Sequence, residues 1–259
     1  MALHPLVIDL EGWPVTVVGG GGGVEEGAAA FCADGCTLEP DADLFCEDAS
    51  DDAGDGKLCT WSDNAGAGSI NWQASHSGTF SCTDKGTYAL QLGYSGGGAT
   101  YVAWDNGSET NSLYGVIYFN ITAESISAGE NVWIVKGLDE AGPSSSFTIG
   151  VQDVSGTLRA YTEYRDAGSW PSATASSHSI TVGAWYRLRF SFVDESNFSA
   201  WIADQDGSNE EQFVNDSLSN SRSVRHIYLG TGDNADAAAT IQIDNTKFDD
   251  DTMPGYCGS

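Results

Sequence analysis

Residues 180–192 read ITVGAWYRLRFSF, and this stretch decides the fold of the chain. One side of it carries Tyr186, Leu188, Phe190 and Phe192, and the other carries Trp185, Arg187, Arg189 and Ser191. A period of two is the pattern of a β-strand whose two faces differ. The stretch therefore predicts a strand with an apolar face turned to a core and a more polar face turned away from it.

Three further strand-like segments follow this one. Residues 198–203 (FSAWIA) end in the turn signal Asp204–Ser208, in which Gly207 can adopt positive φ, so the segment is interpreted as a hairpin partner. Residues 224–229 (VRHIYL) and 240–248 (TIQIDNTKF) complete the series.

Taken together, these segments match a known pattern. A Gly-x-Trp-Tyr-x-Leu-x-Phe strand, a strand before an Asp-x-Asp-Gly turn, an Ile-Tyr-Leu-Gly strand and a closing Ile-Asp-Asn strand resemble the C-terminal half of concanavalin A-like, or laminin-G-like, jelly rolls. The resemblance covers Gly183 to Phe248. It implies an antiparallel β-sandwich, and it says almost nothing about activity.

The rest of the chain fits an all-β fold. It holds 32 Gly, eight Trp, ten Tyr and ten Phe, and no long window has the period of a helix. Further strands are predicted at residues 43–48, 69–72, 77–82, 87–94, 100–104, 112–121, 131–138, 146–152 and 157–164. Turn signals such as Asp105-Asn-Gly107 separate them, which indicates two stacked antiparallel sheets.

The N-terminal region differs from the remainder. Residues 1–18 are apolar and partly alternating, and five glycines follow at Gly19–Gly23. The first segment is interpreted either as an extended arm that needs a partner surface or as an ordinary first strand of the sandwich. The predicted organisation is an arm, glycine linker and cysteine-containing segment over 1–41, followed by a jelly-roll domain over 42–259.

The charge of the chain limits its partners. Its formal net charge of −27 argues against binding nucleic acid or an anionic membrane, and no run of 18 apolar residues predicts a membrane span. The acidic residues are interpreted as a hydrated, self-repelling surface, with Ca²⁺ binding by some clusters as the alternative.

Six cysteines, an even number, favour disulfides with 15 conceivable pairings. They are Cys32, Cys36, Cys46, Cys59, Cys82 and Cys257. A zinc site at the first four and reduced buried thiols are the alternatives. Disulfides predict an oxidising location, yet the first ten residues do not resemble a secretory signal. A removed leader, or release from a cytoplasm as part of a virion, would reconcile the two.

The sequence lacks the catalytic motifs typical of enzymes in the resembling family. Glycan hydrolases of the resembling family place acids on one strand as Glu-x-Asp-x-x-Glu, whereas Glu163-Tyr-Arg-Asp166 puts its acids on opposite faces and is interpreted as surface charge. The Gln-x-His and Tyr-x-Lys strands of polysaccharide lyases are not found either. His226 is expected on an exposed polar strand face, and His76 and His178 in solvated serine-rich loops. The sequence therefore predicts a protein that is not an enzyme.

Carbohydrate binding is predicted at two tryptophan-bearing turns, because sugar sites combine aromatic faces with Asp and Asn. Packing of each tryptophan beneath its loop is the alternative. The candidate residues are Trp104, Asp105, Asn106 and Trp170. Trp133, Trp185 and Trp201 lie on strands and are expected in the core.

The resemblance also suggests a Ca²⁺ site where the opening and closing strands of a jelly roll are neighbours. Its predicted ligands are Glu47, Asp48, Asp244 and Asn245. Residues Asp249–Asp251 fit a solvated acidic tail equally well.

The function predicted from these features is a non-enzymatic structural protein of a virion surface, such as a head decoration or fibre protein of a tailed bacteriophage. Its arm would attach to other subunits in a homo-oligomer or larger assembly, and its jelly roll would bind cell-surface or environmental glycans. The alternative is a secreted glycan-binding module or glycan-active enzyme, either a glycoside hydrolase or a polysaccharide lyase.

Overall fold

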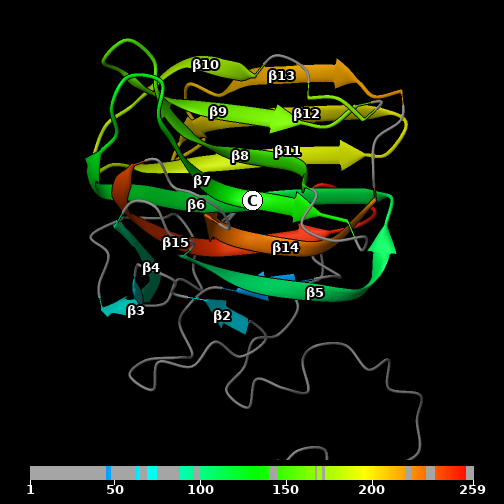
Figure 1. Ribbon diagram of the computed structural model, residues 1–259, viewed down its shortest axis with the longest axis horizontal. Helices are drawn as coiled ribbons and strands as arrows, with labels where there is room; N and C mark the ends of the chain where they lie inside the picture. The colour runs from blue at the N-terminus through cyan, green and yellow to red at the C-terminus, as the bar shows by residue number, and fades with distance from the viewer. Residues whose placement is uncertain are drawn as a thin grey trace, which may run out of the picture.

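The computed structural model describes residues 45–47, 62–64, 69–74, 88–95, 100–139, 145–166, 168–170, 173–219, 223–231 and 237–254. Within these ranges the chain forms fifteen β-strands and no helix. The strands make two antiparallel sheets that stack face to face (Figure 1), which confirms the predicted sandwich. No helix in the described part of the chain could cross a membrane.

Among the described residues, one sheet has eight strands and the other has seven. The eight-stranded sheet runs in the order β13 (Glu211–Ser217), β12 (Asn197–Asp204), β11 (Trp185–Val193), β6 (Ser112–Ser125), β15 (Ala238–Asp249), β4 (Tyr88–Ser95) and β3 (Ser69–Ala74), with β1 (Phe45–Glu47) paired to β15. The seven-stranded sheet runs in the order β10 (Thr174–Ile180), β9 (Leu158–Tyr164), β8 (Ser145–Asp153), β7 (Asn131–Leu138), β14 (Val224–Thr231), β5 (Thr100–Thr110) and β2 (Ser62–Asn64).

Residues 185–192, the alternating part of the stretch 180–192, lie in β11 between β12 and β6, whereas Ile180 ends β10. Its predicted apolar face, from Tyr186 to Phe192, lies in the central core, and its arginines lie on the opposite face. The predicted hairpin with β12 is confirmed, and Gly207 in its turn has a φ of +83°.

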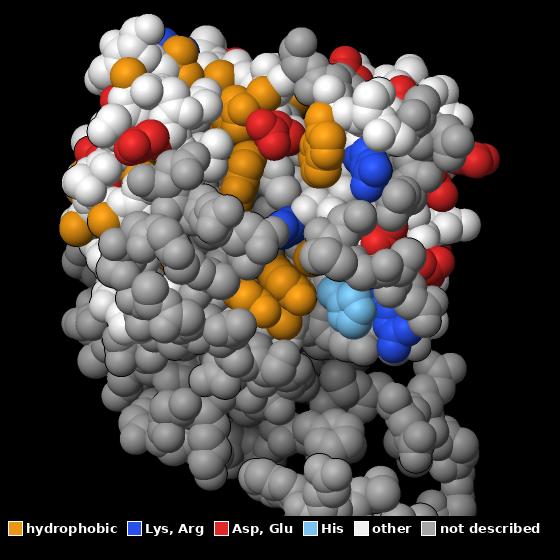
Figure 2. Space-filling model, viewed as in Figure 1, with side chains coloured by type: hydrophobic (Ala, Val, Ile, Leu, Met, Phe, Trp, Pro, Cys, Tyr) orange, Lys and Arg blue, Asp and Glu red, His pale blue; other side chains and the backbone are white. Residues whose placement is uncertain are grey.

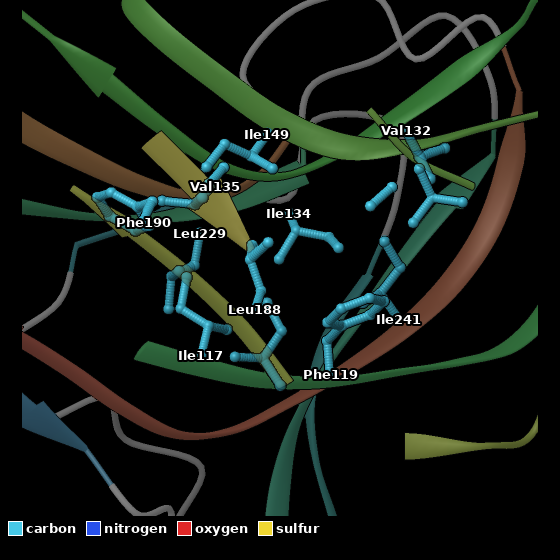
Figure 3. Packing of buried hydrophobic residues seen from close by; sticks show 14 of the residues in the cluster. Ile117, Phe119, Val132, Ile134, Val135, Ile149, Leu188, Phe190, Leu229 and Ile241 are labelled. Atoms are coloured by element: carbon cyan, nitrogen blue, oxygen red, sulfur yellow. The ribbon is translucent and has the colours of Figure 1, made fainter. Parts of the chain in front are cut away.

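The core between the sheets is dense in aromatic and branched side chains (Figure 3). Phe147 from the seven-stranded sheet meets three phenylalanines of the other sheet, with ring centroids 5.0 Å from Phe190, 5.2 Å from Phe192 and 5.5 Å from Phe198. Each such pair contributes about 0.5–1.5 kcal/mol beyond the area it buries. These contacts fix the two sheets relative to each other.

The turn predicted at Asp105-Asn-Gly107 is wrong, because β5 continues through it to Thr110. β5 pairs with β14, and the register of that ladder shifts between Val224 and His226. Asp105 is paired with His226 and Thr110 with Val224, so residues 106–109 form a bulge at the turn signal and the ladder resumes beyond it.

The serine-rich loop predicted around His178 is also wrong, because this segment forms the edge strand β10. A register shift against β9 between Ala175 and Ser179 leaves the backbone N–H groups of Ser177 and His178 to donate to the Glu211 carboxylate, each at 2.7 Å. The His178 side chain is only 10% exposed, and its Nε2 lies 3.3 Å from Asp204 Oδ1. Glu211 and Asp204 belong to the other sheet, so this edge of the sandwich is closed by polar contacts.

Of the three strand tryptophans expected in the core, Trp185 is buried in a hydrophobic cluster, whereas Trp133 and Trp201 are only half-buried. Trp185 is buried on the outer face of the eight-stranded sheet, in a cluster that includes Met253. Trp201 lies on the same sheet beneath the guanidinium of Arg189, 4.9 Å from the ring centroid. Trp133 is half-buried on the outer face of the seven-stranded sheet. In each strand the alternate residues fill the core instead.

Candidate functional site

The outer face of the seven-stranded sheet gathers the side chains that could carry chemistry. On β14, Ile227 and Leu229 lie in the core, so Tyr228 and His226 point outward. On β9, Leu158 and Ala160 lie in the core, so Arg159, Tyr161 and Glu163 point outward. Figure 2 shows hydrophobic side chains around a recessed basic side chain over β7, and a histidine side chain over β14.

Lys136 on β7, together with His226 and Tyr228 on β14, forms what we call the central cluster. Tyr228 is directly opposite Lys136 in the β14–β7 ladder, a register that places Cβ atoms about 5 Å apart. His226 precedes Tyr228 by two residues on the same strand, at roughly 7 Å. The cluster therefore combines an ammonium group, an imidazole and a phenol within reach of one sugar ring.

Lys136 points outward because its neighbour on β7, Gly137, points inward toward Phe147. Gly137 faces the core, and a Cβ at this position would lie 2.4 Å from a ring atom of Phe147. Phe147 thus takes the space of a side chain at 137. The Lys136 side chain is left on the outer face, where the residue is only 6% exposed.

A stacked tyrosine pair borders the central cluster. The rings of Tyr101 on β5 and Tyr228 are 4.2 Å apart between centroids and 6° from parallel. The stack fixes the ring of Tyr228, so its hydroxyl has a defined direction.

Trp133 and Tyr161 meet on the other side of the cluster, with centroids 5.8 Å apart. The tyrosine hydroxyl donates to Glu163 Oε1 at 2.8 Å. Burial, followed by this hydrogen bond, raises the pKa of Tyr161 well above its ordinary value of 10.0, although a hydrogen bond from Gln152 acts in the opposite direction. Tyr161 therefore keeps its proton at neutral pH and serves as a donor, not as a base.

The predicted carbohydrate residues fall in different places. Asp105 is paired with His226 in the β5–β14 ladder, and Trp104 with Ile227, so the backbone of this predicted site runs beside the central cluster. Asn106 follows on the same strand. Trp170 is 45% exposed on the tight turn after β9, apart from the other three.

The strands of the predicted Ca²⁺ site are neighbours, since Glu47 is paired with Thr246 in the β1–β15 ladder. Asp244 is 2% exposed on β15, which also contains Asn245. Asp48 lies outside the described residues. In the described part of the chain no three His, Cys, Asp or Glu side chains are grouped to hold a metal, and Ca²⁺ binding stays a prediction.

Other predictions lie largely outside the described residues. These include the arm and linker over 1–41 and the cysteines Cys32, Cys36, Cys59, Cys82 and Cys257. Cys46 is described only as a backbone position in β1.

Lys136, Tyr228, Tyr101, Tyr161 and Gln152 were not among the residues predicted for a site. The alternation of His226 and Tyr228 with core residues was a usable signal, as was a lysine in an otherwise apolar strand. His226 was expected to be exposed, but it is half-buried between β7 and β5.

No protein-family model and no curated protein sequence matches the chain. Several solved structures share its fold. An endo-β-1,4-glucuronan lyase from the fungus Trichoderma reesei has 17% sequence identity and a TM-score of 0.55, with 79% of this chain and 94% of the lyase covered. A carbohydrate esterase from Shiga toxin-encoding bacteriophage phi24B has 14% identity and a TM-score of 0.54, with coverage of 79% and 96%. A cellulose-induced protein has 13% identity and a TM-score of 0.53, with coverage of 80% and 99%.

These likenesses show the fold, and they correct one prediction. The chain was expected not to be an enzyme because its sandwich carried no catalytic motif. That inference is contradicted, since two structures of the same architecture are those of a glycan lyase and a carbohydrate esterase. The likenesses themselves show the fold alone, and the virion location stays a prediction.

Proposed function

We propose that the protein is a glycan-active enzyme that cleaves an acidic polysaccharide by β-elimination on the outer face of the seven-stranded sheet. The observation that carries this proposal is the central cluster, in which Lys136, His226 and Tyr228 are neighbours on two paired strands. The fold likeness to a glucuronan lyase supports the choice of a uronate polymer as substrate.

Each member of the cluster has a role in such a reaction. The Lys136 ammonium group pairs with the uronate carboxylate and stabilises the negative charge that develops when the proton at C5 is removed. The neutral imidazole of His226 takes that proton. As the C4–O4 bond breaks and a C4–C5 double bond forms, the Tyr228 hydroxyl gives its proton to the departing oxygen.

The charge of the whole chain opposes an acidic substrate, so local cations have to offset it. Lys136, Arg159 and Arg225 all lie on strands of the seven-stranded sheet. Of these, Lys136 belongs to the central cluster, so it is the cation that would offset the negative charge at the reacting sugar.

The second candidate is a glycan-binding module without turnover, favoured by the aromatic pairs on the same face. Either function calls for an extracellular location, where polymeric glycans are found.

The test is incubation of the purified full chain with glucuronan, alginate and a neutral glucan. We expect unsaturated uronate products, detected by their ultraviolet absorbance, from at least one acidic polymer and none from the neutral one. Tyr228→Phe and His226→Asn should each lower kcat by about 100-fold or more, since general acid or base catalysis contributes that much.

Matched controls lie away from the site. Tyr114→Phe, on the outer face of the eight-stranded sheet, and His178→Asn, on the edge strand β10, should leave kcat within about twofold. Turnover that survives both site variants would assign the chemistry to other residues. Saturable binding of the polymers without any product would establish the binding module in place of the enzyme.

A further inference from the structure

The aromatic pair of Trp133 and Tyr161 is not needed for the elimination step, yet its construction is specific. The two residues come from β7 and β9, which are separated by β8, and Gly150 is the residue of β8 paired with both. With no side chain at 150, the rings of the two outer strands meet above the middle strand, 5.8 Å apart between centroids and tilted by 32°.

A distortion of β7 prevents any side chain from replacing Gly150. The register of the β7–β8 ladder shifts between Trp133 and Val135, which brings the β7 backbone close to β8. A Cβ at 150 would lie 2.1 Å from the Val132 carbonyl oxygen and 2.8 Å from Trp133 Cα. Both the bulge and the glycine therefore support the ring pair.

Polar groups lie along one rim of the pair. Glu163 accepts the Tyr161 hydroxyl through Oε1, and a carboxylate can accept further hydrogen bonds, so Oε2 is suited to a ligand hydroxyl. Gln152 is held nearby by donating from Nε2 to the Gly129 carbonyl at 3.1 Å. A half-buried indole beside a fixed carboxylate and a fixed amide is a surface for a flat, hydroxyl-bearing ring.

We propose that Trp133, Tyr161 and Glu163 form a sugar-binding subsite that holds a neighbouring sugar of the polysaccharide cleaved at the central cluster. The inference rests on the proposed function, and it adds that the subsite accepts the sugar ring in one orientation only. The ring stacks on Trp133 with hydroxyl groups toward Glu163, and its own carboxylate must point away from Glu163 because like charges repel. Trp133 is three residues from Lys136 on β7, roughly 10 Å along the strand, which suits a different sugar of the same chain.

The experiment measures kcat and KM on glucuronan oligosaccharides of increasing length. Trp133→Ala should raise KM for the longer oligosaccharides about tenfold while kcat changes little, because truncating an aromatic anchor removes binding and not chemistry. Trp133→Phe should restore most of the affinity. Glu163→Gln keeps a hydrogen-bond acceptor without the charge, so it should bind a uronate in either orientation and shift the ratio of product lengths.

Trp201→Ala, a strand tryptophan on the other sheet, is the matched control and should leave KM unchanged. Binding is also measured by calorimetry in the Tyr228→Phe variant, which separates affinity from turnover. An unchanged KM and affinity in folded Trp133→Ala, or in Trp133→Leu if the alanine variant does not fold, would overturn the subsite and leave the proposed function intact. Wild-type protein that binds oligosaccharides through Trp133 but never cleaves them would overturn the function and leave the subsite.

Discussion

Two glycines decide which side chains reach the outer face of the seven-stranded sheet. Gly137 gives its inward space to Phe147, and Gly150 lets Trp133 and Tyr161 meet across β8. In both cases the missing side chain matters more than backbone freedom. A methyl group at 137 would collide with the Phe147 ring in the core, and one at 150 would collide with the β7 backbone.

Gly137→Ala should lower the free energy of unfolding by about 1–3 kcal/mol, because the new methyl group overlaps the Phe147 ring. Chemical denaturation monitored by fluorescence measures the loss. Adding Phe147→Leu should recover part of it, since the smaller side chain leaves room. A double variant that is destabilised by the full sum of the two single effects would show that the glycine is not matched to this ring.

Tyr164 predicts a loss of stability in alkali. Burial, together with hydrogen bonding of its hydroxyl to Asp216 at 2.8 Å, raises the pKa of Tyr164 from 10.0 to about 12. The folded state holds this proton more tightly than the unfolded state, so its stabilising effect is complete below pH 10.0 and is lost as the pH rises to about 12. Denaturation midpoints at several pH values should fall more steeply in wild type than in Tyr164→Phe over that range. Parallel curves would contradict the assignment.

At the scale of elements, β10 shows how a weak strand is held at an edge. Its sequence, TASSHSI, has few β-forming residues, and its ladder with β9 is interrupted by a bulge. The backbone N–H groups that the bulge leaves without a ladder partner donate to Glu211 on β13. These hydrogen bonds between the two sheets, which we call the seam, hold β10 where its own ladder is interrupted. Burial alone would raise the pKa of Glu211, but the hydrogen bonds from Ser177 and His178 outweigh it and lower that pKa below its ordinary value.

Glu211→Gln should loosen this seam and cost about 1 kcal/mol, because the amide offers one acceptor oxygen for three donors. Hydrogen exchange at Ser177 and His178 should speed up, while exchange in β11 stays slow.

The pH dependence provides the control for that variant. A lowered pKa means that the stabilisation is present above the ordinary value of 4.5 and disappears as the pH falls through the folded-state pKa. Wild type and Glu211→Gln should therefore converge in acid. A constant difference down to low pH would exclude the charged seam as the cause.

The strands that could be predicted were those whose alternation is strong. β11 begins at Trp185, where its alternation begins, and β7 covers residues 131–138 as predicted. β10 and β13 were missed because their residues are mostly small and polar, and pairing with neighbours makes them strands. β5 runs through a turn signal because its ladder with β14 resumes at Thr110 after a bulge over residues 106–109.

For the whole molecule, the two outer faces differ in what covers them. The outer face of the eight-stranded sheet includes a buried cluster of Trp185, Tyr118 and Val116 with Met253 packed on it. The outer face of the seven-stranded sheet carries the two aromatic pairs and the central cluster. A ligand is therefore expected on the outer face of the seven-stranded sheet.

The net charge of −27 predicts that salt stabilises the folded protein. Raising the ionic strength from about 0.01 to 0.15 M shortens the Debye length from roughly 30 to 8 Å and screens repulsion between acidic groups. Relief of about 1 kcal/mol would raise Tm by roughly 2–4 °C. Differential scanning fluorimetry measures the shift, with sucrose of equal osmolality as the control. A Tm that does not rise with salt, or rises equally with sucrose, would show that self-repulsion is not limiting.

The sequence by itself determined the two-layered β fold, because alternation within each strand records which face is buried, and this information is local. It also led to Asp105 and Trp104, whose strand borders the central cluster. The central cluster itself was decided only by the tertiary structure. Lys136 and Tyr228 are far apart in the chain and belong to no shared motif, and they become neighbours because β14 pairs with β7 in one register. That register depends on packing across the whole core, which no single segment of the sequence specifies.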